Sequence, residues 1–397
     1  MKILNDITLT GKRVLIRVDF NVPILNGEVA NDFRIRAALP TIQYCIEKGA
    51  SIVLMSHLGR PKGEMVPEMS LEPVAFALEE ILDKDVFFSN DCISEDALNF
   101  SKQLRPGEIH LLENLRFYNE ETVNDLDFAE QLAQHADVFI NDAFGTAHRA
   151  HASNVGIIQF MKETVSGFLL QKEKEYLTSA IKTPKTPFVV VLGGAKVKGK
   201  IELIKNMMQS ADRILIGGAM AFTFLKVQGK NVGASLVDDE NLKTAETLLN
   251  LSEKMGVPIE LPVDVVVAPE LNDNVPWRVA LLDEIDDDEM GFDIGPETTM
   301  IYENILADAK TVLWNGPMGV FEIPIFSTGS QSIASMIQHT TTEGATTIIG
   351  GGDTAAAIES FKMKKAFSHV STGGGASLEL LSGKYLPAFK ALDEHES

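Results

Sequence analysis

The sequence predicts an α/β protein that is built on parallel sheets and divided into two domains. The chain has 397 residues, which corresponds to about two or three domains of ordinary size. Short runs rich in Val, Ile and Leu recur without polar alternation, which is typical of strands buried on both faces of a parallel sheet. Helix-like stretches separate these runs, as in sheets joined by right-handed crossovers.

The predicted strands lie, in chain order, within the apolar runs 13–21, 51–60, 109–117, 137–149, 188–196, 213–222, 311–319, 346–355 and 369–377. Helix-like stretches between them cover 71–82, 125–136 and 241–255. A further amphipathic helix is expected over 167–182, and it should end at the prolines of 183–187 because proline cannot continue a helix. The acidic run 283–289 is expected to be a solvated loop or turn.

Polar residues follow the predicted strands, and their kind changes along the chain. The ends of the first four runs carry Asp, Asn, His and Arg, whereas the ends of the later runs carry glycines with Lys or Asp. In parallel α/β sheets, ligands bind beyond the C-terminal ends of the strands. The change therefore predicts two domains with different ligands, and the break is expected near 165–187.

Composition and charge exclude several classes of protein. Hydrophobic residues make up 45% of the chain and charged residues 23%, which is ordinary for a globular protein and excludes the disordered and fibrous classes. The formal net charge is −21, and such a negative field repels phosphate. We therefore expect no nucleic-acid partner and no membrane partner, and a phosphate ligand would need a local basic pocket.

Cysteine usage and the first residues of the chain predict a cytoplasmic location. Cys45 and Cys92 are far apart and form no CxxC or Cys/His cluster, so neither a disulfide framework nor a structural zinc site is expected. Residues 1–15 contain no apolar signal-peptide core. The longest apolar runs, such as 188–192, are too short to span a bilayer.

Glycine-rich segments follow four of the later strands, at 193–196, 217–218, 350–352 and 373–375. Backbone N–H groups beside glycines can surround a phosphate, and a helix N-terminus adds a favourable dipole. Each segment alone could be a tight turn that needs small residues. Four of them in one half of the chain favour a nucleotide site.

Two of these segments nearly match known nucleotide motifs. Residues 194–200 fit the P-loop pattern up to its last position, where Ile201 stands in place of the Ser or Thr that binds Mg²⁺. Residues 350–355 fit the form G-x-G-x-x-A, but Ser371 and its neighbours occupy the place of the acidic ribose ligand. A P-loop nucleoside triphosphatase and a dehydrogenase are therefore both disfavoured.

Two lysines are spaced for a shared ligand. If a helix begins after Gly194, Lys196 and Lys200 lie on one face of it. Two ammonium groups in a first turn oppose the helix dipole, and this placement makes sense beside phosphates. The alternative is a pair of solvated surface lysines.

Two carboxylates could also serve a nucleotide. Asp353 directly follows three glycines, and Mg²⁺ typically takes one or two carboxylates together with phosphate oxygens. Asp353 could equally be the N-cap of a helix that starts at Thr354. Glu322 could accept hydrogen bonds from ribose hydroxyls.

The first half of the chain carries basic residues at or just beyond its apolar runs. Arginine gives bidentate recognition of phosphate and carboxylate, so this cluster predicts a small polyanionic substrate, although each arginine alone could form an ordinary surface pair. His57, His148 and His151 lack the spacing and the acid of a metal site. The candidate substrate residues are Asp19, Asn21, Arg34, His57, Arg60, Arg116 and Arg149.

Nine segments together resemble the phosphoglycerate kinase family. They are RVDFNVP (17–23), SHLGRP (56–61), LLENLRF (111–117), DAFGTAHRAHAS (142–153), LGGAKV (192–197), GGAMAFTF (217–224), WNGPMGVFE (314–322), GGGDT (350–354) and STGGGAS (371–377). They run in the family's order from residue 17 to residue 377, so the resemblance covers the whole chain.

The resemblance implies two Rossmann-like three-layer α/β/α domains that are joined by an interdomain helix. Residues 1–168 would bind 3-phosphoglycerate or 1,3-bisphosphoglycerate, 169–187 would form the helix and linker, and 188–382 would bind ADP or ATP with Mg²⁺. The C-terminal segment, from about 383 to 397, would return to the N-terminal domain. The resemblance implies reversible phosphoryl transfer from 1,3-bisphosphoglycerate to ADP in glycolysis, by a monomer that closes about a hinge near Gly167 and 293–296.

The resemblance also implies roles for individual residues. Asp19 and Asn21 would contact the glycerate, and Arg34 would orient its carboxyl group and stabilise the migrating phosphoryl group. His57, Arg60, Arg116 and Arg149 would hold the substrate phosphate. The implied catalytic set is Arg34, Lys196, Lys200, Gly351 and Gly374. The implied nucleotide set is Gly194, Ala195, Lys196, Lys200, Gly217, Gly218, Asn315, Pro317, Glu322, Gly350, Gly351, Gly352, Asp353 and Thr354, with Asp353 as the metal ligand.

The departures from the family pattern are small. Gly199 stands where the family often has Asp before the second lysine, which could loosen that turn. Two alternatives remain open at this point. One is another acyl-phosphate kinase, and the other is a nucleotide-binding scaffold without catalysis.

Overall fold

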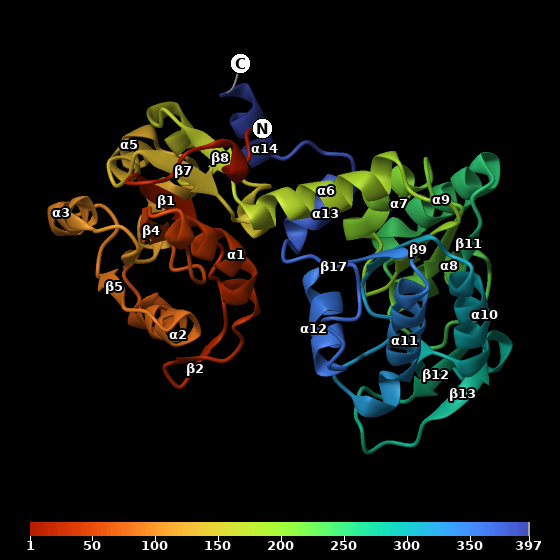
Figure 1. The fold of residues 1–397 in the computed structure, drawn as a ribbon. Helices are drawn as coiled ribbons and strands as arrows, with labels where there is room; N and C mark the ends of the chain where they lie inside the picture. Colours follow the sequence, from red (N-terminus) through yellow and green to blue (C-terminus); the bar gives the residue numbers. More distant parts are fainter. Residues whose placement is uncertain (396–397) are drawn as a thin grey trace. The chain divides into compact units, whose positions relative to one another are not determined.

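The computed structural model describes residues 1–395, and contacts divide the chain into two compact units. Unit 1 comprises Met1–Glu175 together with the C-terminal residues from Tyr385, and unit 2 comprises Tyr176–Lys384. The border falls inside helix α6 (Phe168–Lys182), so the predicted helix over 167–182 is confirmed and belongs to both units (Figure 1). Within residues 1–395, no helix has the length and apolar character needed to cross a membrane.

Unit 1 is built around a parallel sheet of six strands in the order β5-β6-β4-β1-β7-β8. Its strands are β1 (Arg13–Arg17), β4 (Ser51–Met55), β5 (Val86–Ser89), β6 (Ile109–Leu112), β7 (Val138–Asn141) and β8 (Thr164–Ser166), with a hairpin of β2 (Ile24–Leu25) and β3 (Glu28–Val29). Its helices are α1 (Phe33–Glu47), α2 (Glu72–Leu82), α3 (Glu95–Gln103), α4 (Asn119–Val123), α5 (Leu126–Ala133) and α14 (Pro387–Glu394).

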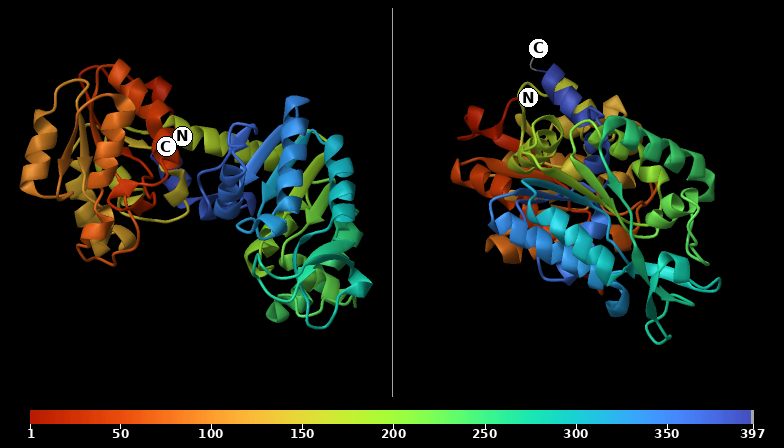
Figure 2. Two further views of the ribbon diagram at one scale, coloured as in Figure 1. Left: turned by 90° about the horizontal axis from the view of Figure 1, so that it is seen from below. Right: turned by 90° about the vertical axis from the view of Figure 1, so that its right-hand side faces the viewer.

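Side chains of the sheet of unit 1 point alternately to its two faces. Val14 and Ile16 of β1 pack in one core with Ile35 and Ile42 of α1 and with Leu78 of α2. The strands carry no polar alternation because helices cover both faces of the sheet, which can be followed in the left view of Figure 2. The predicted strands at 13–21, 51–60, 109–117 and 137–149 are therefore confirmed, each shorter than its apolar run.

A chain of buried hydrogen bonds crosses unit 1 between its strands and α3. The Nε2 atom of His135 lies 3.0 Å from the carbonyl oxygen of Cys92, which can only accept, so this nitrogen carries the hydrogen. Nδ1 of His135 then accepts from the Ser101 hydroxyl at 2.7 Å, and the Ser101 oxygen accepts from Nδ1 of His110 at 2.9 Å. Nε2 of His110 accepts from the Ser89 hydroxyl at 2.7 Å. Both histidines are thus satisfied in the neutral state, and burial lowers the pKa of His110 to about 3 and that of His135 to about 4.

Acid is expected to destabilise unit 1 through these two histidines. Both titrate near 6.5 when unfolded, so between about pH 6.5 and 4 the unfolded chain binds more protons than the folded chain. The free energy of unfolding is therefore complete above about pH 6.5 and falls as the pH drops toward 4. Urea unfolding of the wild type and of His110→Asn, which keeps a donor toward Ser101 but takes up no proton, should show a shallower loss in the variant. His339→Asn, at an exposed position, should keep the wild-type slope, and equal slopes for all three proteins would contradict this reading.

The C-terminal segment packs on unit 1 beside the N-terminus (Figure 2). The backbone N–H of Ala388 donates to the carbonyl of Ala147 at 3.1 Å, and Nδ1 of His395 lies 3.2 Å from the Thr164 hydroxyl. The amino group of Met1 forms an ion pair with Asp393 at 2.6 Å. Residues 396 and 397 of the expected returning segment lie outside the described residues.

Unit 2 is built around a second parallel sheet of six strands, in the order β11-β10-β9-β15-β16-β17. Its strands are β9 (Phe188–Leu192), β10 (Arg213–Ile216), β11 (Ile259–Glu260), β15 (Thr311–Asn315), β16 (Thr346–Gly350) and β17 (His369–Val370). Its helices are α7 (Ile201–Met207), α8 (Met220–Val227), α9 (Leu242–Met255), α10 (Pro296–Ala307), α11 (Thr328–Thr342), α12 (Gly352–Ser360) and α13 (Gly375–Leu381).

Helices cover both faces of the main sheet of unit 2. Val189 and Val191 of β9 share a core with Tyr302 of α10, Ile333 of α11 and Ile358 of α12. Figure 1 shows these three helices on one side of the sheet and α7 and α13 on the other. The strands predicted in the second half of the chain and the helix predicted at 241–255 are confirmed, and so are two α/β units with parallel main sheets.

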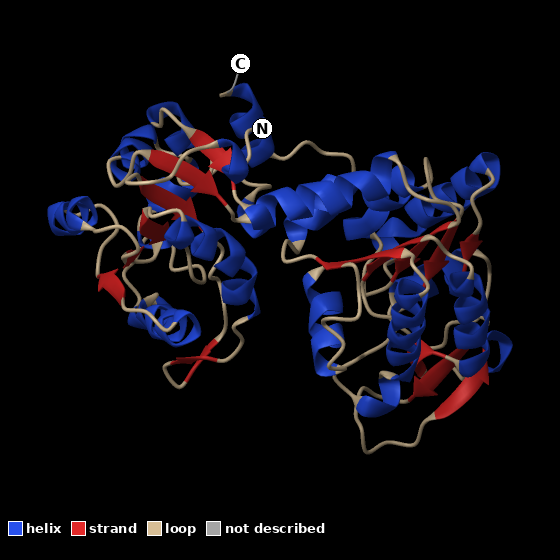
Figure 3. Ribbon diagram, viewed as in Figure 1, coloured by secondary structure: helices blue, strands red, loops and turns tan. Residues whose placement is uncertain are grey.

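A small antiparallel sheet in unit 2 was not predicted. It has the order β13-β12-β14, from β13 (Arg278–Leu281), β12 (Asp264–Ala268) and β14 (Met290–Ile294), and it is drawn apart from the main sheet in Figure 3. The run in β12 is buried throughout and cannot be told from a parallel strand by its composition. The acidic run 283–289 is largely an exposed loop after a short 3₁₀ turn, as expected, and two of its carboxylates pair with Arg278.

Candidate active site

Polar side chains from the C-terminal ends of the unit 1 strands meet around the loop after β4. The Gly59 N–H donates to Oδ1 of Asn21 at 2.9 Å, and Nη1 of Arg116 donates to the Gly59 carbonyl at 2.7 Å. Gly59 has a φ of +63°, and a Cβ there would lie 2.7 Å from Sδ of Met69, so this turn requires glycine. The loop therefore joins predicted site residues that lie 95 positions apart in the chain.

Asn114 fixes the same loop from the side of β6. Its Oδ1 accepts from the N–H groups of Leu58 and Arg116, and its Nδ2 donates to the carbonyls of Leu58 and Met69. All four hydrogen bonds are between 2.7 and 3.1 Å. Asn114 is fully buried, so it acts as a structural tie that places Arg116 and the loop.

A pair from α1 and the end of β1 completes this edge. Nη1 of Arg34 donates to Oδ2 of Asp19 at 2.8 Å, and Oδ1 of Asp19 accepts from the Asn21 N–H at 3.3 Å. Asp19 is buried, with 5% of its surface exposed, whereas Arg34 is partly exposed. The hydrogen bond to Asp19 thus holds one side of the Arg34 guanidinium.

Positive charge dominates the edge. Burial, followed by repulsion from Arg17 and Arg149, lowers the pKa of Arg116 to about 10. Nε of Arg116 is buried and has no hydrogen-bond partner among the described residues. Arg149 lies in the loop after the 3₁₀ turn Phe144–Thr146, with its Nε donating to Nε2 of His148, and Arg60 is exposed beside Gly59. The arginines of this cluster outnumber its carboxylates, so the cluster suits a small anion.

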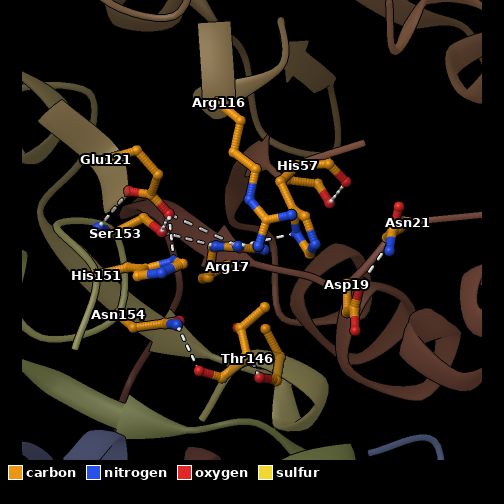
Figure 4. A network of polar contacts seen from close by, with 12 residues as sticks. Arg17, Asp19, Asn21, His57, Arg116, Glu121, Thr146, His151, Ser153 and Asn154 are labelled. Carbon is orange, nitrogen blue, oxygen red and sulfur yellow. Dashed lines mark hydrogen bonds and ion pairs between the residues drawn. The ribbon is translucent and has the colours of Figure 1, made fainter. Parts of the chain in front are cut away.

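The structure therefore brings together Asp19, Asn21, Arg34, His57, Arg116 and Arg149, with Arg60 at the exposed side of the loop. Asp19, Asn21, His57 and Arg116 are labelled in Figure 4. Sequence reasoning missed three buried residues that support them: Arg17, Asn114 and Glu121. Arg17 carried a signal, because a charged residue between Ile16 and Val18 in an otherwise apolar run needs a buried partner.

In unit 2, Lys200 lies at the C-terminal ends of β9 and β15. Its Nζ donates to the Gly193 carbonyl, and Cβ atoms built on Gly194 and Gly316 would lie 3.1 and 2.7 Å from it. Burial lowers the pKa of Lys200 to about 8, while Asp353 opposes this shift. Gly194 and Gly316 leave the room in which the ammonium group sits.

The first glycine-rich loops also contact one another. The Gly194 N–H donates to the Pro317 carbonyl at 2.9 Å, and the Gly194 carbonyl accepts from Met220 at the start of α8. Gly218 has a φ of +64°, and a Cβ there would lie 2.5 Å from the backbone nitrogen of Gly194. The predicted residues Gly194, Gly217, Gly218 and Pro317 thus form one edge of the sheet, with Ala195 exposed beside them.

The loop after β16 lies next to that edge. Gly351 has a φ of +91°, and Asn315 Nδ2 would be 3.1 Å from a Cβ placed on it. The buried hydroxyl of Thr354 accepts from the Gly316 N–H at 2.6 Å, so Thr354 joins α12 to the end of β15. Asp353 is exposed in the first turn of α12.

The remaining predicted residues are placed as follows. Gly350 and Gly352 end β16 and begin α12, and Gly374, with a φ of +48°, precedes α13. Glu322 is exposed in the turn after β15.

Two local predictions about unit 2 are wrong. No helix begins after Gly194: the chain turns through 193–196, forms a 3₁₀ turn at Lys198–Lys200, and becomes α-helical only at Ile201. Gly194 has a φ of +90°, which no helix residue adopts, so Lys196 and Lys200 do not share a helix face, and Lys196 is exposed. Asp353 is not an N-cap either, because α12 starts at Gly352 and its N-cap is Gly351.

The donors of this edge fit a hard cation that is shared with phosphates. Asp353 is the acidic residue at the edge, and within residues 1–395 no group of three or more His, Cys, Asp or Glu side chains could hold a metal ion by itself. Mg²⁺ commonly takes one or two carboxylates and completes its shell with phosphate oxygens and water. The residues present therefore fit Mg²⁺ that arrives with a nucleotide.

Comparisons with known proteins agree on one family. The sequence model of the family described as phosphoglycerate kinase matches residues 4–384. The phosphoglycerate kinase of Chloroherpeton thalassium is 50% identical over 391 residues, covering 98% of both chains, and that of Thermosipho africanus is 53% identical over 390 residues, covering 98% of this chain and 97% of its own. The solved phosphoglycerate kinase structure from Coxiella burnetii has a TM-score of 0.89 and 42% identity, over 99% of each chain.

Two parallel α/β units, one with an arginine-rich edge and one with a glycine- and lysine-lined edge, define an α/β phosphotransferase. Its acceptor is a carboxyl group. The chain belongs to the phosphoglycerate kinase family. It is a glycolytic kinase that transfers a phosphoryl group reversibly from 1,3-bisphosphoglycerate to ADP, giving 3-phosphoglycerate and ATP.

Proposed function

We propose that the two substrates bind to different units. Residues 1–168, with the segment from about 383 onward, would hold the phosphoglycerate, 188–382 would hold the nucleotide, and 169–187 would link them. The observation that carries this assignment is the contrast between the two sheet edges. Positive charge that carboxylates do not fully balance gathers around Arg116 in unit 1, and glycine loops surround Lys200 in unit 2.

In unit 1, Asp19 and Asn21 bind the glycerate hydroxyl and carboxyl region, and Arg34 orients the carboxyl group. The hydrogen bond between Arg34 and Asp19 supports this role, since it holds the guanidinium in one orientation before substrate binds. His57, Arg60, Arg116 and Arg149 hold the distant phosphate. The buried Nε of Arg116, which has no hydrogen-bond partner within residues 1–395, supports the presence of an anion there.

In unit 2, Lys196 binds the nucleotide phosphates, Lys200 binds the transferring phosphoryl group, and Glu322 binds the ribose. The loops at Gly217, Gly218 and 350–352 line the nucleotide, with Asn315, Pro317 and Thr354 shaping them. Gly351 and Gly374 lie on the phosphoryl path. Asp353 would hold Mg²⁺, which would neutralise phosphate charge when the nucleotide is bound.

The chemistry requires alignment and charge neutralisation and needs no general base. The acyl phosphate is already activated, and in the reverse direction the carboxylate of 3-phosphoglycerate is already deprotonated. Arg34, Lys196 and Lys200 supply positive charge around a loose, in-line transition state, and glycine-loop amides supply fixed dipoles. We propose that the units close about a hinge near Gly167 and 293–296, which excludes water and limits hydrolysis. We also propose that the protein acts as a monomer in the cytoplasm.

Measuring ADP release from Mg·ATP tests the acceptor and its site. Release should require 3-phosphoglycerate and should not occur with acetate, because the arginine cluster needs a second anionic group on the acceptor. Release with acetate would indicate another acyl-phosphate kinase. Binding of ATP without release under any condition would indicate a scaffold without catalysis.

Arg60→Ala should raise the KM for 3-phosphoglycerate by about tenfold and change kcat much less. The reason is that Arg60 is exposed at the loop and holds the non-reacting phosphate, so its contact is equal in the ground and transition states. Steady-state kinetics with each substrate varied in turn measure both constants. If the KM for ATP rose and that for 3-phosphoglycerate did not, the assignment of the two units would be reversed.

A further inference from the structure

The environment of His57 determines which of its ring nitrogens carries a hydrogen. Nη2 of Arg17 lies 3.2 Å from Nδ1 of His57, and both side chains are buried (Figure 4). A guanidinium has only donors, so Nδ1 of His57 must be the acceptor. A neutral His57 therefore carries its hydrogen on Nε2, the nitrogen that Arg17 does not contact.

Arg17 is held by contacts on all sides of its guanidinium. Its Nε donates to the Ser153 hydroxyl at 2.8 Å, and its Nη1 donates to the carbonyl of Val18. Oε1 of Glu121 lies 3.9 Å from Nη2 and balances the buried charge. Since Arg17 has no exposed surface, it cannot itself bind substrate, and its orientation is set by these partners.

Glu121 is anchored in turn by the loop that carries Arg149. Its carboxylate accepts from the Ser153 N–H at 2.9 Å and from the Ser153 hydroxyl at 2.7 Å, and Nδ1 of His151 lies 3.5 Å from it. The ion pair thus connects β1, α4 and this loop in one network. The network ends at Nδ1 of His57, which is the only nitrogen of that ring with a contact drawn in Figure 4.

The positively charged groups around His57 disfavour a positive charge on the His57 ring itself. The groups that face it from the neighbouring elements are Arg17 of β1, Arg34 of α1, Arg116 of the 3₁₀ turn Leu115–Phe117, and His151. Burial and then these groups hold the pKa of His57 well below its ordinary value of 6.5. The carboxylates of the network are engaged elsewhere, Asp19 with Arg34 and Glu121 with Ser153.

We propose that Arg17 is a positioning residue that holds His57 as a neutral Nε2–H donor in the phosphoglycerate site. The proposal rests on the assignment of His57 to that site made above. A neutral donor gives the anion a directed hydrogen bond without adding repulsion to the arginines beside it. His57 would therefore contribute equally across the pH range in which an ordinary histidine changes charge.

Two-dimensional NMR of protein labelled with ¹⁵N in its histidines tests this directly. The His57 signals, assigned with His57→Gln, should show the Nε2–H tautomer and should not titrate between about pH 5.5 and 8.5. An Nδ1–H tautomer, or titration near 6.5, would overturn the proposal. Adding 3-phosphoglycerate should shift the Nε2–H signal. If the ring is a neutral Nε2–H tautomer but its signal does not respond to 3-phosphoglycerate, the assignment of His57 to the substrate site is refuted. The effect of Arg17 on the tautomer would still hold in that case.

Kinetics separate a donor from a cation. His57→Gln keeps an N–H donor near the position of Nε2 and should keep the KM for 3-phosphoglycerate within about threefold, whereas His57→Phe should raise it by about tenfold or more. If His57 acted as a cation, Gln and Phe would be equally harmful, and that result would overturn the proposal.

Arg17→Lys tests the positioning role and keeps the buried charge. It should raise the KM for 3-phosphoglycerate by about tenfold with a smaller change in kcat, and the His57 signals should become those of a titrating or mixed-tautomer ring. Arg13→Lys is the matched control, since Arg13 lies on the same strand but contacts Asp137 and the His135 carbonyl. Wild-type tautomer and KM in Arg17→Lys, with the protein folded by circular dichroism, would refute the role of Arg17.

Discussion

Lys200→Met is expected to lower kcat by at least about tenfold, which corresponds to the loss of about 1.4 kcal/mol of transition-state stabilisation. The ammonium group sits at the ends of β9 and β15, where Gly194 and Gly316 leave room for it. Methionine has a similar length but no charge, so it removes the interaction with the transferring phosphoryl group and leaves the packing. Rapid-quench or coupled assays at saturating substrates measure the effect.

The pH dependence of kcat/KM for ATP in the wild type and in Lys200→Arg tests whether the charge of Lys200 matters. Because burial lowers the pKa of Lys200 to about 8, free wild-type enzyme should lose its ammonium charge as the pH rises through about 8. The kcat/KM for ATP reports groups of the free enzyme, so it should fall above this pH. Lys200→Arg keeps its charge and should not show that fall.

Lys205→Met is the matched control for Lys200. Lys205 lies in α7 close by in sequence, and its ammonium group forms an exposed pair with Glu202 at 3.0 Å. Its replacement should leave kcat unchanged. An unchanged kcat in Lys200→Met as well would end the assignment of Lys200 to the phosphoryl group.

Glu121→Gln is expected to lower the free energy of unfolding by about 3–5 kcal/mol. The substitution keeps the size of the side chain but removes the charge of the carboxylate that pairs with the buried Arg17 guanidinium, and both side chains are 0% exposed. The Arg17 charge cannot be lost by deprotonation, so the cost falls on the folded state. Chemical denaturation followed by circular dichroism measures the change, since Trp277 and Trp314 both lie in unit 2 and do not report on unit 1.

Glu202→Gln provides the control for Glu121. Its side chain is 65% exposed in its pair with Lys205, so the loss should be at most about 1 kcal/mol. A loss for Glu121→Gln no larger than that of the control would show that Ser153 and His151, and not the charge of Glu121, stabilise the network.

Much of the fold could be predicted from the sequence because its strands are buried on both faces. Runs such as those in β1, β9 and β15 have no polar alternation, and their ends are marked by the polar or glycine residues that form the two edges. The antiparallel pairing of β12 with β13 and β14 could not be predicted. Strand direction is set by this pairing, and a run of valines has the same composition in parallel and antiparallel strands. The helix that would place Lys196 and Lys200 on one face does not begin after Gly194 but at Ile201, because a lysine spacing of four is compatible with a helix but does not require one.

The sequence by itself determined the chemistry that the protein carries, namely which arginines, lysines, glycines and carboxylates follow its strands, and through them its family. Only the tertiary structure decided how those groups are held. The residues that hold them, Arg17, Asn114 and Glu121, are distant in sequence from their partners, and their effect arises from burial, where an unpaired charge or amide is costly. The hydrogen on Nε2 of His57 follows from a contact across 40 residues, which becomes visible only when β1 and β4 lie side by side.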